Sequence, residues 1–306
     1  MGDSDRLAHY GTFGLSRIVT QVVNVRRQRS HVPELVDTKL ERLRRDEARI
    51  AVALDGPDRR SVRDRKMIVV GPGQLLREAR YFAVGNRVVC LDLDVIPKGI
   101  DPLAYAQMMR RNGVGRVLKT VGRKLIGNDR LELQLWRQRL GVAKLPDPEC
   151  RVGDICDGAP EPGSWDVIAS WSVFQSIPDA RLAVRRCAEA LRPGGALYIG
   201  IHLWTSNTGH HDIRAFSGQE DAFPLWAHLR PREAHLIEPS AYLNELRLGD
   251  WRSIFDDVCP GFTEYQERYD EAGYRAKMTP ALREELSAYS DEELYSVDVF
   301  FAWRKP

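Results

Sequence analysis

The chain lacks any apolar run that approaches the roughly 20 residues a membrane-spanning helix needs. Residues 1–17 also lack the order of basic, apolar and small residues that marks a secretory signal. From these two absences we expect a cytoplasmic protein without a transmembrane helix.

Cysteine is scarce and unpaired in sequence, with five residues and no CxxC motif. Structural zinc sites usually take their ligands from closely spaced pairs, so we expect no metal of this kind. The odd count and the apolar surroundings of most of these cysteines favour buried, reduced thiols.

The net charge is only +2, but it is unevenly distributed along the 306 residues. Residues 1–66 hold 15 basic and 10 acidic side chains, and residues 97–146 hold 11 basic and 3 acidic ones. Such segregation is typical of a surface that meets an anionic partner, and equally of a solvated helix face. Both interpretations stay open at this stage.

The hydrophobic pattern changes at about residue 66. Residues 1–66 read as helices with polar breaks, including a charged helix over 34–53 that ends at an Asp-Gly-Pro turn. From residue 67 onward, short apolar runs alternate with helical stretches, which predicts an α/β fold with a largely parallel sheet. Strands are expected at 67–70, 87–93, 149–152, 165–170, 196–202 and 296–303. Helices are expected after residue 73 and at 179–191, 242–255 and 280–289.

A glycine turn joins the first expected strand to its helix. The turn is Gly71-Pro72-Gly73, and Asp92 follows 21 positions after Gly71, near the end of the second expected strand. Glycines let a ligand approach the backbone, and an acidic residue about 20 positions on can accept hydrogen bonds from ribose hydroxyls. We therefore predict a nucleotide-type ligand, whereas a bare strand-to-helix turn is the alternative.

Two other nucleotide motifs are missing. A dinucleotide fingerprint has its third glycine at position 76, where this chain has Leu76, and no Gly-Lys-Ser/Thr sequence exists for a P-loop. The turn thus suits a ligand that carries adenosine without phosphates, and an NAD-dependent oxidoreductase is disfavoured.

Five segments in order resemble the motifs of the class I, Rossmann-like, S-adenosylmethionine-dependent methyltransferases: VVGPG, CLDLD, VGDICD, WDVIASWSVFQSIPD and ALRPGGALYIGIHLW. The resemblance covers about residues 67–202, with 296–303 as the antiparallel last strand. It implies a doubly wound, mostly parallel seven-stranded sheet with S-adenosylmethionine as cofactor and S-adenosylhomocysteine as product.

The same resemblance assigns the cofactor-binding residues. Gly71, Pro72 and Gly73 would face the methionine part, and Asp92 would hold the ribose hydroxyls. The adenine would lie between Leu93 and Ile155, with its amino group donating to Asp154. The end of the fourth strand would line the pocket near the transferred methyl through Ser170 and Trp171.

The chain departs from the family at three places. Val69 stands where an acidic residue is frequent, and Phe174-Gln175-Ser176 replaces a frequent Leu-Glu-His. The segment between the second and third expected strands is also unusually long. These departures leave room for a scaffold that binds the cofactor without turnover.

Three histidines cluster after the fifth expected strand, within residues 202–212. Loops beyond the carboxyl ends of strands carry chemistry in α/β enzymes, and imidazole is a suitable base near neutral pH. We therefore predict His210 or His211 as a catalytic base, with His202 next. Polar loop residues that satisfy the backbone, and a metal site with Asp212, are the alternatives, and we expect no metal.

The sequence says less about the methyl acceptor than about the cofactor. The segments YLNELRLGDWRSIF and LREELSAYSDEELYSVDVFFAWRKP weakly resemble bacterial methyltransferases associated with surface-polysaccharide genes, which implies O-methylation of a glycan or small-molecule hydroxyl. A nucleic-acid methyltransferase is the rival, but SWSVF lacks the Asn/Asp-Pro-Pro-Tyr/Phe signature of base amino-group methylation, and no RNA-binding module is visible.

The predicted organisation has two parts. Residues 1–66 form an N-terminal helical extension or cap, and 67–306 form the methyltransferase domain, with a helical insertion at 97–146 and a substrate-side elaboration at 203–260. The insertion carries an apolar stripe opposite basic residues, which suits a packed lid or an approach to anionic membrane or lipid-linked substrate. A homodimer is a further open expectation.

Overall fold

The computed structural model describes residues 31–96, 128–216 and 223–306. Within this part of the chain, seven strands form one sheet: β1 Lys66–Val70, β2 Arg87–Asp92, β3 Glu149–Val152, β4 Trp165–Trp171, β5 Leu191–His202, β6 Thr263–Glu267 and β7 Asp298–Arg304.

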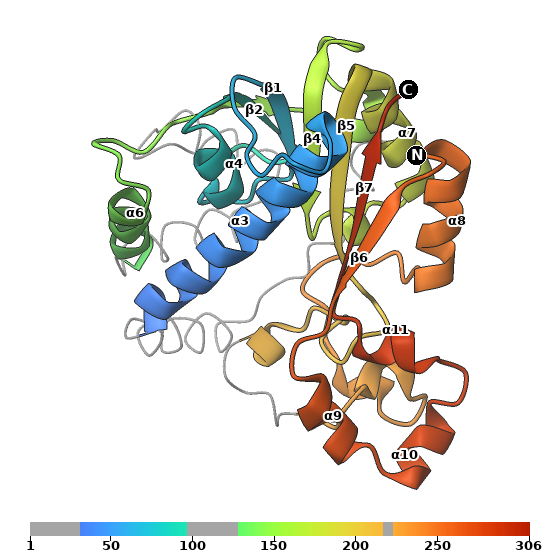
Figure 1. The fold of residues 1–306 in the computed structure, drawn as a ribbon. Coiled ribbons are helices and arrows are strands. Elements are labelled where there is room, and N and C mark those ends of the chain that lie inside the picture. The colour runs from blue at the N-terminus through green and yellow to red at the C-terminus, as the bar shows by residue number, and fades with distance from the viewer. Residues whose placement is uncertain (1–30, 97–127, 217–222) are drawn as a thin grey trace.

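The strand order is β3-β2-β1-β4-β5-β7-β6 (Figure 1). All neighbours run parallel except β7, which is antiparallel to both β5 and β6. This confirms the expected seven-stranded, mostly parallel sheet with an antiparallel last strand. The chain moves outward from β1 to β3 and then returns to β4 beside β1, so the topology reverses between β1 and β4. In open α/β sheets, ligands bind at the carboxyl ends of the strands at such a switch point.

Helices cover both faces of the sheet. One face packs against α7 (Ala180–Ala190) and α8 (Leu248–Val258), and the other against α3 (Val32–Asp55), α4 (Arg77–Phe82) and α6 (Asn128–Arg139). Each strand alternates between the two cores, as Ile68 and Val70 lie in the first and Met67 and Val69 in the second. A strand buried on both sides needs apolar residues at consecutive positions, which explains the run over 67–70.

Helix α3 crosses one face of the sheet and contacts β5 and β7 (Figure 1). Its apolar side, with Val36, Leu40, Leu43 and Ile50, is buried at helical spacing. The helix ends at Gly56, whose φ of 100° is readily adopted only by glycine. The charged segment before residue 66 is therefore one layer of the α/β core, and the proposed division at residue 66 stays a prediction.

A buried carboxylate fixes α3 to the sheet. Asp46, 0% exposed, accepts hydrogen bonds from the Tyr198 hydroxyl at 2.5 Å and the Trp171 indole N–H at 2.8 Å. Arg49 lies 3.3 Å from the same carboxylate and 3.0 Å from Glu267 on β6. Burial raises the pKa of Asp46 despite these partners. The polar contacts thus satisfy groups that would be costly to bury alone.

The arginines of α3 meet an acidic row on the outer strands. Asp298 and Glu267 lie directly opposite each other on β7 and β6, where like charges repel. Arg42 lies 3.1 Å from Asp298, while Arg45 and Arg49 lie 3.5 Å and 3.0 Å from Glu267. Since positions 42, 45 and 49 share one face of a helix, α3 neutralises both acids at once.

A third, smaller apolar cluster lies beyond the carboxyl end of β5, where Figure 1 shows α9 (Glu271–Lys277), α10 (Pro280–Glu285) and α11 (Asp291–Tyr295). Trp226, Leu286, Leu294 and Tyr295 form its centre. The segment after β5 and the segment between β6 and β7 thus build a small unit together, next to the carboxyl end of β5 and the beginning of β7.

Several predicted boundaries were wrong. β5 begins at Leu191, so the Arg-Pro-Gly-Gly turn lies inside a strand with a register shift between Trp165 and Val167 of its partner. Helix α8 begins at residue 248 instead of 242, and β6, α9 and α11 were not predicted. Much of the predicted insertion, residues 97–127, lies outside the described residues, so its membrane-facing role stays untested. No helix in the described part is both long and apolar enough to span a membrane.

The buried network of Asp46 can be tested by Tyr198→Phe. The substitution removes the donor to Asp46 but keeps the ring, so we expect the free energy of unfolding to fall by about 1–3 kcal/mol, the cost of leaving a buried charged group underbonded. Urea denaturation measures this loss.

Tyr265→Phe is the matched control, because this β6 ring also lies against Arg49 and its hydroxyl makes no hydrogen bond within the described segments. It should change stability by less than about 0.5 kcal/mol. An equal loss in both variants would contradict the role of the Asp46 contact.

Candidate functional site

Several residues with left-handed backbone follow strands at the carboxyl edge of the sheet. Gly71 and Gly73 follow β1 with φ of 63° and 65°, and three of the eight described non-glycine residues with positive φ also follow these strands: Leu76 after β1, Ser172 after β4 and His211 after β5. Such residues cost energy and persist mainly where the surrounding structure fixes them, which is frequent at functional sites. The carboxyl edge of the sheet, where the strand order reverses, thus includes some of the strained positions of the described residues.

The glycine turn lies against the segment that follows β4. The Gly71 N–H donates to the Leu91 carbonyl at 2.8 Å, and a Cβ at Gly71 would come within 2.4 Å of a Val173 side-chain atom. Gly73 faces open space, with nothing within 4 Å of such a Cβ. The helix expected after the turn is present as α4, but it begins only at Arg77 and has six residues.

The end of β2 presents an acidic and an apolar side chain together. Asp92 is partly exposed, and its Oδ1 accepts from the Asp94 N–H at 2.8 Å. Leu93, next to it, is 51% exposed. The Gly153 N–H donates to the Asp92 carbonyl at 2.9 Å, which brings the end of β3 alongside.

After β3, Asp154 caps a short 3₁₀ helix, Ile155–Asp157, by accepting from the Cys156 N–H at 2.8 Å. Ile155 is buried in the core, 4% exposed. The structure therefore places the glycine turn, Asp92 and Asp154 in one row along three adjacent strands, as the sequence predicted for their order.

The end of β4 is more buried than the end of β2. Ser170 is 0% exposed, and its hydroxyl donates to the Val70 carbonyl at 2.9 Å. Trp171 points toward α3, where its ring stacks on Phe82 at 5.6 Å and donates to Asp46. These two residues have structural partners, and their proposed position beside the methyl group stays a prediction.

Gln175 replaces an expected acidic residue and is 3% exposed. Within the described residues neither its amide nitrogen nor its amide oxygen has a hydrogen-bond partner. Its backbone carbonyl accepts from the Asn244 N–H at 2.8 Å. A buried amide with two unsatisfied atoms is unusual, and this one lies two residues from the Val173 contact with the glycine turn.

At the end of β5, His202 lies between two side chains. Its Nδ1 is 3.1 Å from Oδ1 of Asp298, and its Nε2 is 3.0 Å from Oγ1 of Thr208. His202 and Asp298 are directly opposite on β5 and β7. The pairing of two strands therefore creates this contact between residues 96 positions apart.

The other histidines form an edge-to-face cluster behind His202. The ring of His211 lies 4.9 Å from that of His202, and His210 lies 5.0 Å from His228. The His228 Nε2 is 2.8 Å from the Trp204 carbonyl, and the His210 Nδ1 accepts from the Asp212 N–H at 2.9 Å. Burial lowers the pKa of His210 to about 4, and those of His211 and His228 to about 3.

The described residues include no group of three or more His, Cys, Asp or Glu side chains arranged to hold a metal ion. Asp212, the third member of the alternative metal site, instead pairs with Arg214 at 2.5 Å. The expectation of no metal stays a prediction.

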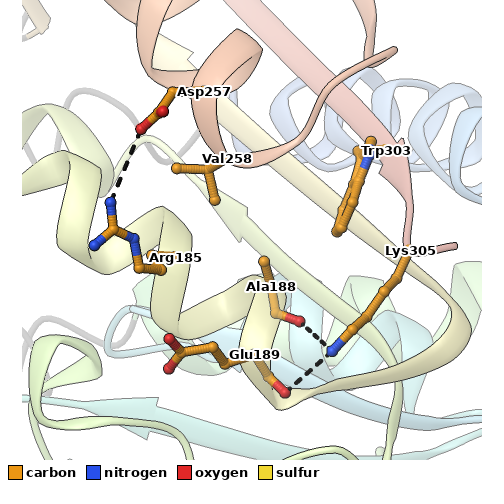
Figure 2. Close-up of a pocket in the computed structure, with 7 residues that line it drawn as sticks. All are labelled: Arg185, Ala188, Glu189, Asp257, Val258, Trp303 and Lys305. Carbon is orange, nitrogen blue, oxygen red and sulfur yellow. Dashed lines mark hydrogen bonds and ion pairs between the residues drawn. The ribbon is translucent and has the colours of Figure 1, made fainter.

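A hollow of about 350 Å³ lies at the opposite edge of the sheet (Figure 2). It is lined by Arg185, Ala188, Glu189, Asp257, Val258, Trp303 and Lys305. Lys305 there donates to the Ala188 and Leu191 carbonyls at 2.8 Å and 2.7 Å, which satisfies the C-terminal carbonyls of α7. Lys305 at this hollow therefore caps the end of α7, and the hollow lies away from the glycine turn.

Residues 112–199 match the family model of a methyltransferase domain. The match begins after the glycine turn and Asp92 and ends in β5. Trans-aconitate 2-methyltransferase of Rhodopseudomonas palustris is 26% identical over 155 residues, which are 48% of this chain and 59% of that protein. The enzyme of the same name from Afipia carboxidovorans is 25% identical over 176 residues, 55% of this chain and 67% of that protein.

The chain thus spans about 59% of the length of the first of these relatives. Together the matches confirm, at the level of the domain, the prediction of a methyltransferase domain. They do not test the expected acceptor hydroxyl or the individual site residues.

Solved structures overlap only loosely with this chain. A methyltransferase from Mesorhizobium loti has a TM-score of 0.42 at 15% identity, covering 80% of this chain and 92% of that one. A putative methyltransferase of Haloferax volcanii, in complex with the activator Trm112, has a TM-score of 0.43 at 16% identity, covering 91% and 97%. Overlaps of this size support no conclusion about function.

The sequence did not identify Asp298, Thr208 and Arg42 as residues of the candidate site. Thr208 lies within the histidine-rich segment that was singled out, and Asp298 is an acidic residue at the start of a predicted apolar strand. Arg42 carried no signal, because only the packing of α3 brings it to Asp298.

The histidine cluster predicts that stability falls between pH 7 and pH 5. In the unfolded chain these imidazoles take up protons below about pH 6.5, whereas the folded protein keeps His228 neutral until its pKa of about 3. Stability is therefore lost as pH falls from 7, by on the order of 1–2 kcal/mol at pH 5 for each such histidine.

His228→Gln keeps a donor for the Trp204 carbonyl and removes the titration, so the loss of Tm from pH 7 to pH 5 should shrink by several degrees. His235→Gln, at an exposed position, is the control and should leave the pH profile unchanged. A His228→Gln profile equal to that of the parent would contradict the effect of burial.

Proposed function

We propose that the chain is an S-adenosylmethionine-dependent methyltransferase that methylates a hydroxyl oxygen of a small molecule or glycan. The row formed by the glycine turn, Asp92 and Asp154 at the switch point of the sheet carries this proposal. The methyltransferase match over the neighbouring strands supports it.

The residues at this edge suit the cofactor. Gly71, Pro72 and Gly73 would contact its methionine part, because Gly73 leaves open space where a side chain would stand. Asp92 would accept hydrogen bonds from the ribose hydroxyls, and the half-exposed Leu93 would lie against the adenine. Asp154 would accept from the adenine amino group with Ile155 beneath the ring, while Ser170 and Trp171 would shape the inner wall.

When bound, S-adenosylmethionine would supply a methyl group on a sulfonium. An acceptor oxygen in line with the carbon–sulfur bond would take this methyl group, and the sulfur would leave as a thioether. The chain's own task is then to align the acceptor and to take the proton that a hydroxyl loses. The groups for this task would come from the end of β5, where His202 lies, and from the segment that follows it, which holds His210 and His211.

The relatives are named for trans-aconitate, a carboxylic acid. A carboxylate is already deprotonated at neutral pH and needs no base, whereas a hydroxyl does. The product distinguishes the two, since alkali hydrolyses a methyl ester to volatile methanol but leaves a methyl ether intact. Transfer of a tritiated methyl group, followed by this treatment, therefore identifies the acceptor class.

Calorimetric titration tests cofactor binding first. We expect S-adenosylmethionine and S-adenosylhomocysteine to bind with micromolar affinity and NAD not to bind. Asp92→Asn keeps an oxygen for the Asp94 N–H but removes the charge, so Kd should rise at least tenfold, or about 1.4 kcal/mol.

Asp157→Asn, which removes an exposed carboxylate on the neighbouring 3₁₀ helix, should leave Kd unchanged. Equal affinity in the parent and Asp92→Asn would refute the ribose assignment. Tight binding without transfer to any acceptor would favour a scaffold over an enzyme.

A further inference from the structure

Three side chains form a continuous hydrogen-bonded chain above β5 and β7. Asp298 Oδ1 lies 3.1 Å from His202 Nδ1, and His202 Nε2 lies 3.0 Å from Thr208 Oγ1. Asp298 is 4% exposed and His202 is 9% exposed, whereas Thr208 is partly exposed. The hydrogen-bonded side chains thus extend from a buried carboxylate to a more accessible residue with a hydroxyl group.

The partners define the protonation of His202. An ionised carboxylate only accepts hydrogen bonds, so the proton of a neutral His202 lies on Nδ1. Nε2 then has a lone pair that accepts from the Thr208 hydroxyl. Burial alone would raise the pKa of Asp298, but the hydrogen bond from His202 and the charge of Arg42 hold it below its ordinary value.

Arg42 keeps the carboxylate in place. It lies 3.1 Å from Oδ2 of Asp298, on the oxygen that His202 does not use. Each oxygen of Asp298 therefore has its own partner, one from α3 and one from β5. This arrangement fixes the orientation of the carboxylate and hence the tautomer of the imidazole.

The position of His202 suits a reaction at the switch point. β5 lies beside β4, which lies beside β1, and Ile199 on β5 pairs with Ser170, which itself pairs with Val70. His202 is three residues beyond that level, so it lies about 10 Å beyond the end of β1 along the strand direction. His210, His211 and His228 are poorer proton acceptors, since burial holds the pKa of each at about 4 or below.

We propose that His202 takes the proton of the acceptor hydroxyl through the hydroxyl of Thr208, with Asp298 and Arg42 as positioning residues. This inference rests on the proposed function and names the groups that would perform its proton transfer. It also favours a hydroxyl over a carboxylate as the acceptor, because a carboxylate has no proton to give.

The proton balance is complete. As the acceptor oxygen exchanges its hydrogen for the transferred methyl, its proton passes to the Thr208 oxygen, and the Thr208 proton passes to Nε2 of His202. The resulting imidazolium is stabilised by Asp298 and later releases its proton to water. No other reactant is required.

The first experiment reads the tautomer without any acceptor. Long-range ¹H–¹⁵N NMR of histidine-labelled protein should show His202 with its proton on Nδ1 at pH 8. In Asp298→Asn, whose amide can donate, the proton should move to Nε2. A wild-type His202 that carries its proton on Nε2, or that stays an imidazolium at pH 8, would overturn the proposal.

The second experiment measures turnover, with an extract of bacterial small molecules below 3 kDa as the acceptor pool and tritium-labelled S-adenosylmethionine. His202→Gln should lower alkali-stable transfer at least 100-fold and change cofactor Kd less than twofold. Thr208→Val should lower transfer similarly, and Thr208→Ser, which restores a hydroxyl, should recover most of it. His235→Gln is the matched control and should be unaffected.

The pH profile separates positioning from simple structural damage. Asp298→Asn should change the shape of the pH dependence of turnover, because it removes a negative charge that lies against the imidazole, where Arg42 and His211 also lie close. A loss of turnover by the same factor at every pH would instead indicate structural damage and would contradict the positioning role of Asp298.

Full turnover in His202→Gln would overturn the proposal. If the wild-type protein binds no cofactor and transfers no label, the proposed function fails, while the NMR result still decides whether His202 has the state of a base.

Discussion

The pairing of acidic residues on β6 and β7 with the arginines of α3 is the constraint on which the rest of the molecule depends. Glu267 and Asp298 lie opposite each other in the ladder, where two carboxylates are unfavourable without counter-charges. Arg42, Arg45 and Arg49 provide these charges from one helix face. The last strands and the first described helix are thus coupled electrostatically as well as by apolar burial.

This coupling explains where the site can lie. Because α3 is held across β5 and β7, it leaves the carboxyl edge of β1, β2 and β3 to the glycine turn and Asp92. On the other side, the segment after β5 and helices α9 to α11 form a small cluster with several aromatic residues beyond the carboxyl end of β5, whose last residue is His202. Under the proposed function, the edge would be divided into a half that binds the cofactor and a half that accepts the proton.

The sequence predicted the sheet well, because buried parallel strands require continuous apolar runs that few other structures need. It placed Gly71, Asp92 and Asp154 in order for the same reason, since each follows such a run. It failed at the turn of residues 192–195, where Pro193 and two glycines normally end an element but here sit in a bulged part of β5. Helix α8 began later than its apolar pattern suggested, and at its first turn the Asp250 carboxylate accepts from the Arg247 N–H at 2.8 Å.

The proton-accepting groups could not be predicted in the same way. His202 was only the third choice, because no local pattern shows that Asp298, almost 100 residues later, lies opposite it. His210 and His211 were favoured by their position in a loop, yet both are packed among aromatic rings, where burial disfavours their protonated form. Non-local pairing and burial decide the chemistry of a histidine, and neither can be predicted from the residues next to it in the sequence.

The strand order also has a consequence for synthesis of the chain. Of the seven described strands, β7 is made last, yet it lies between β5 and β6 and supplies Asp298. A ribosome-bound chain that already has the glycine turn and its row of acidic residues therefore still lacks the partner of His202. Insertion of the terminal strand between two existing ones is a non-local and hence slow step. Competence to bind a nucleoside and competence to move a proton would thus arise at different times in the life of each molecule.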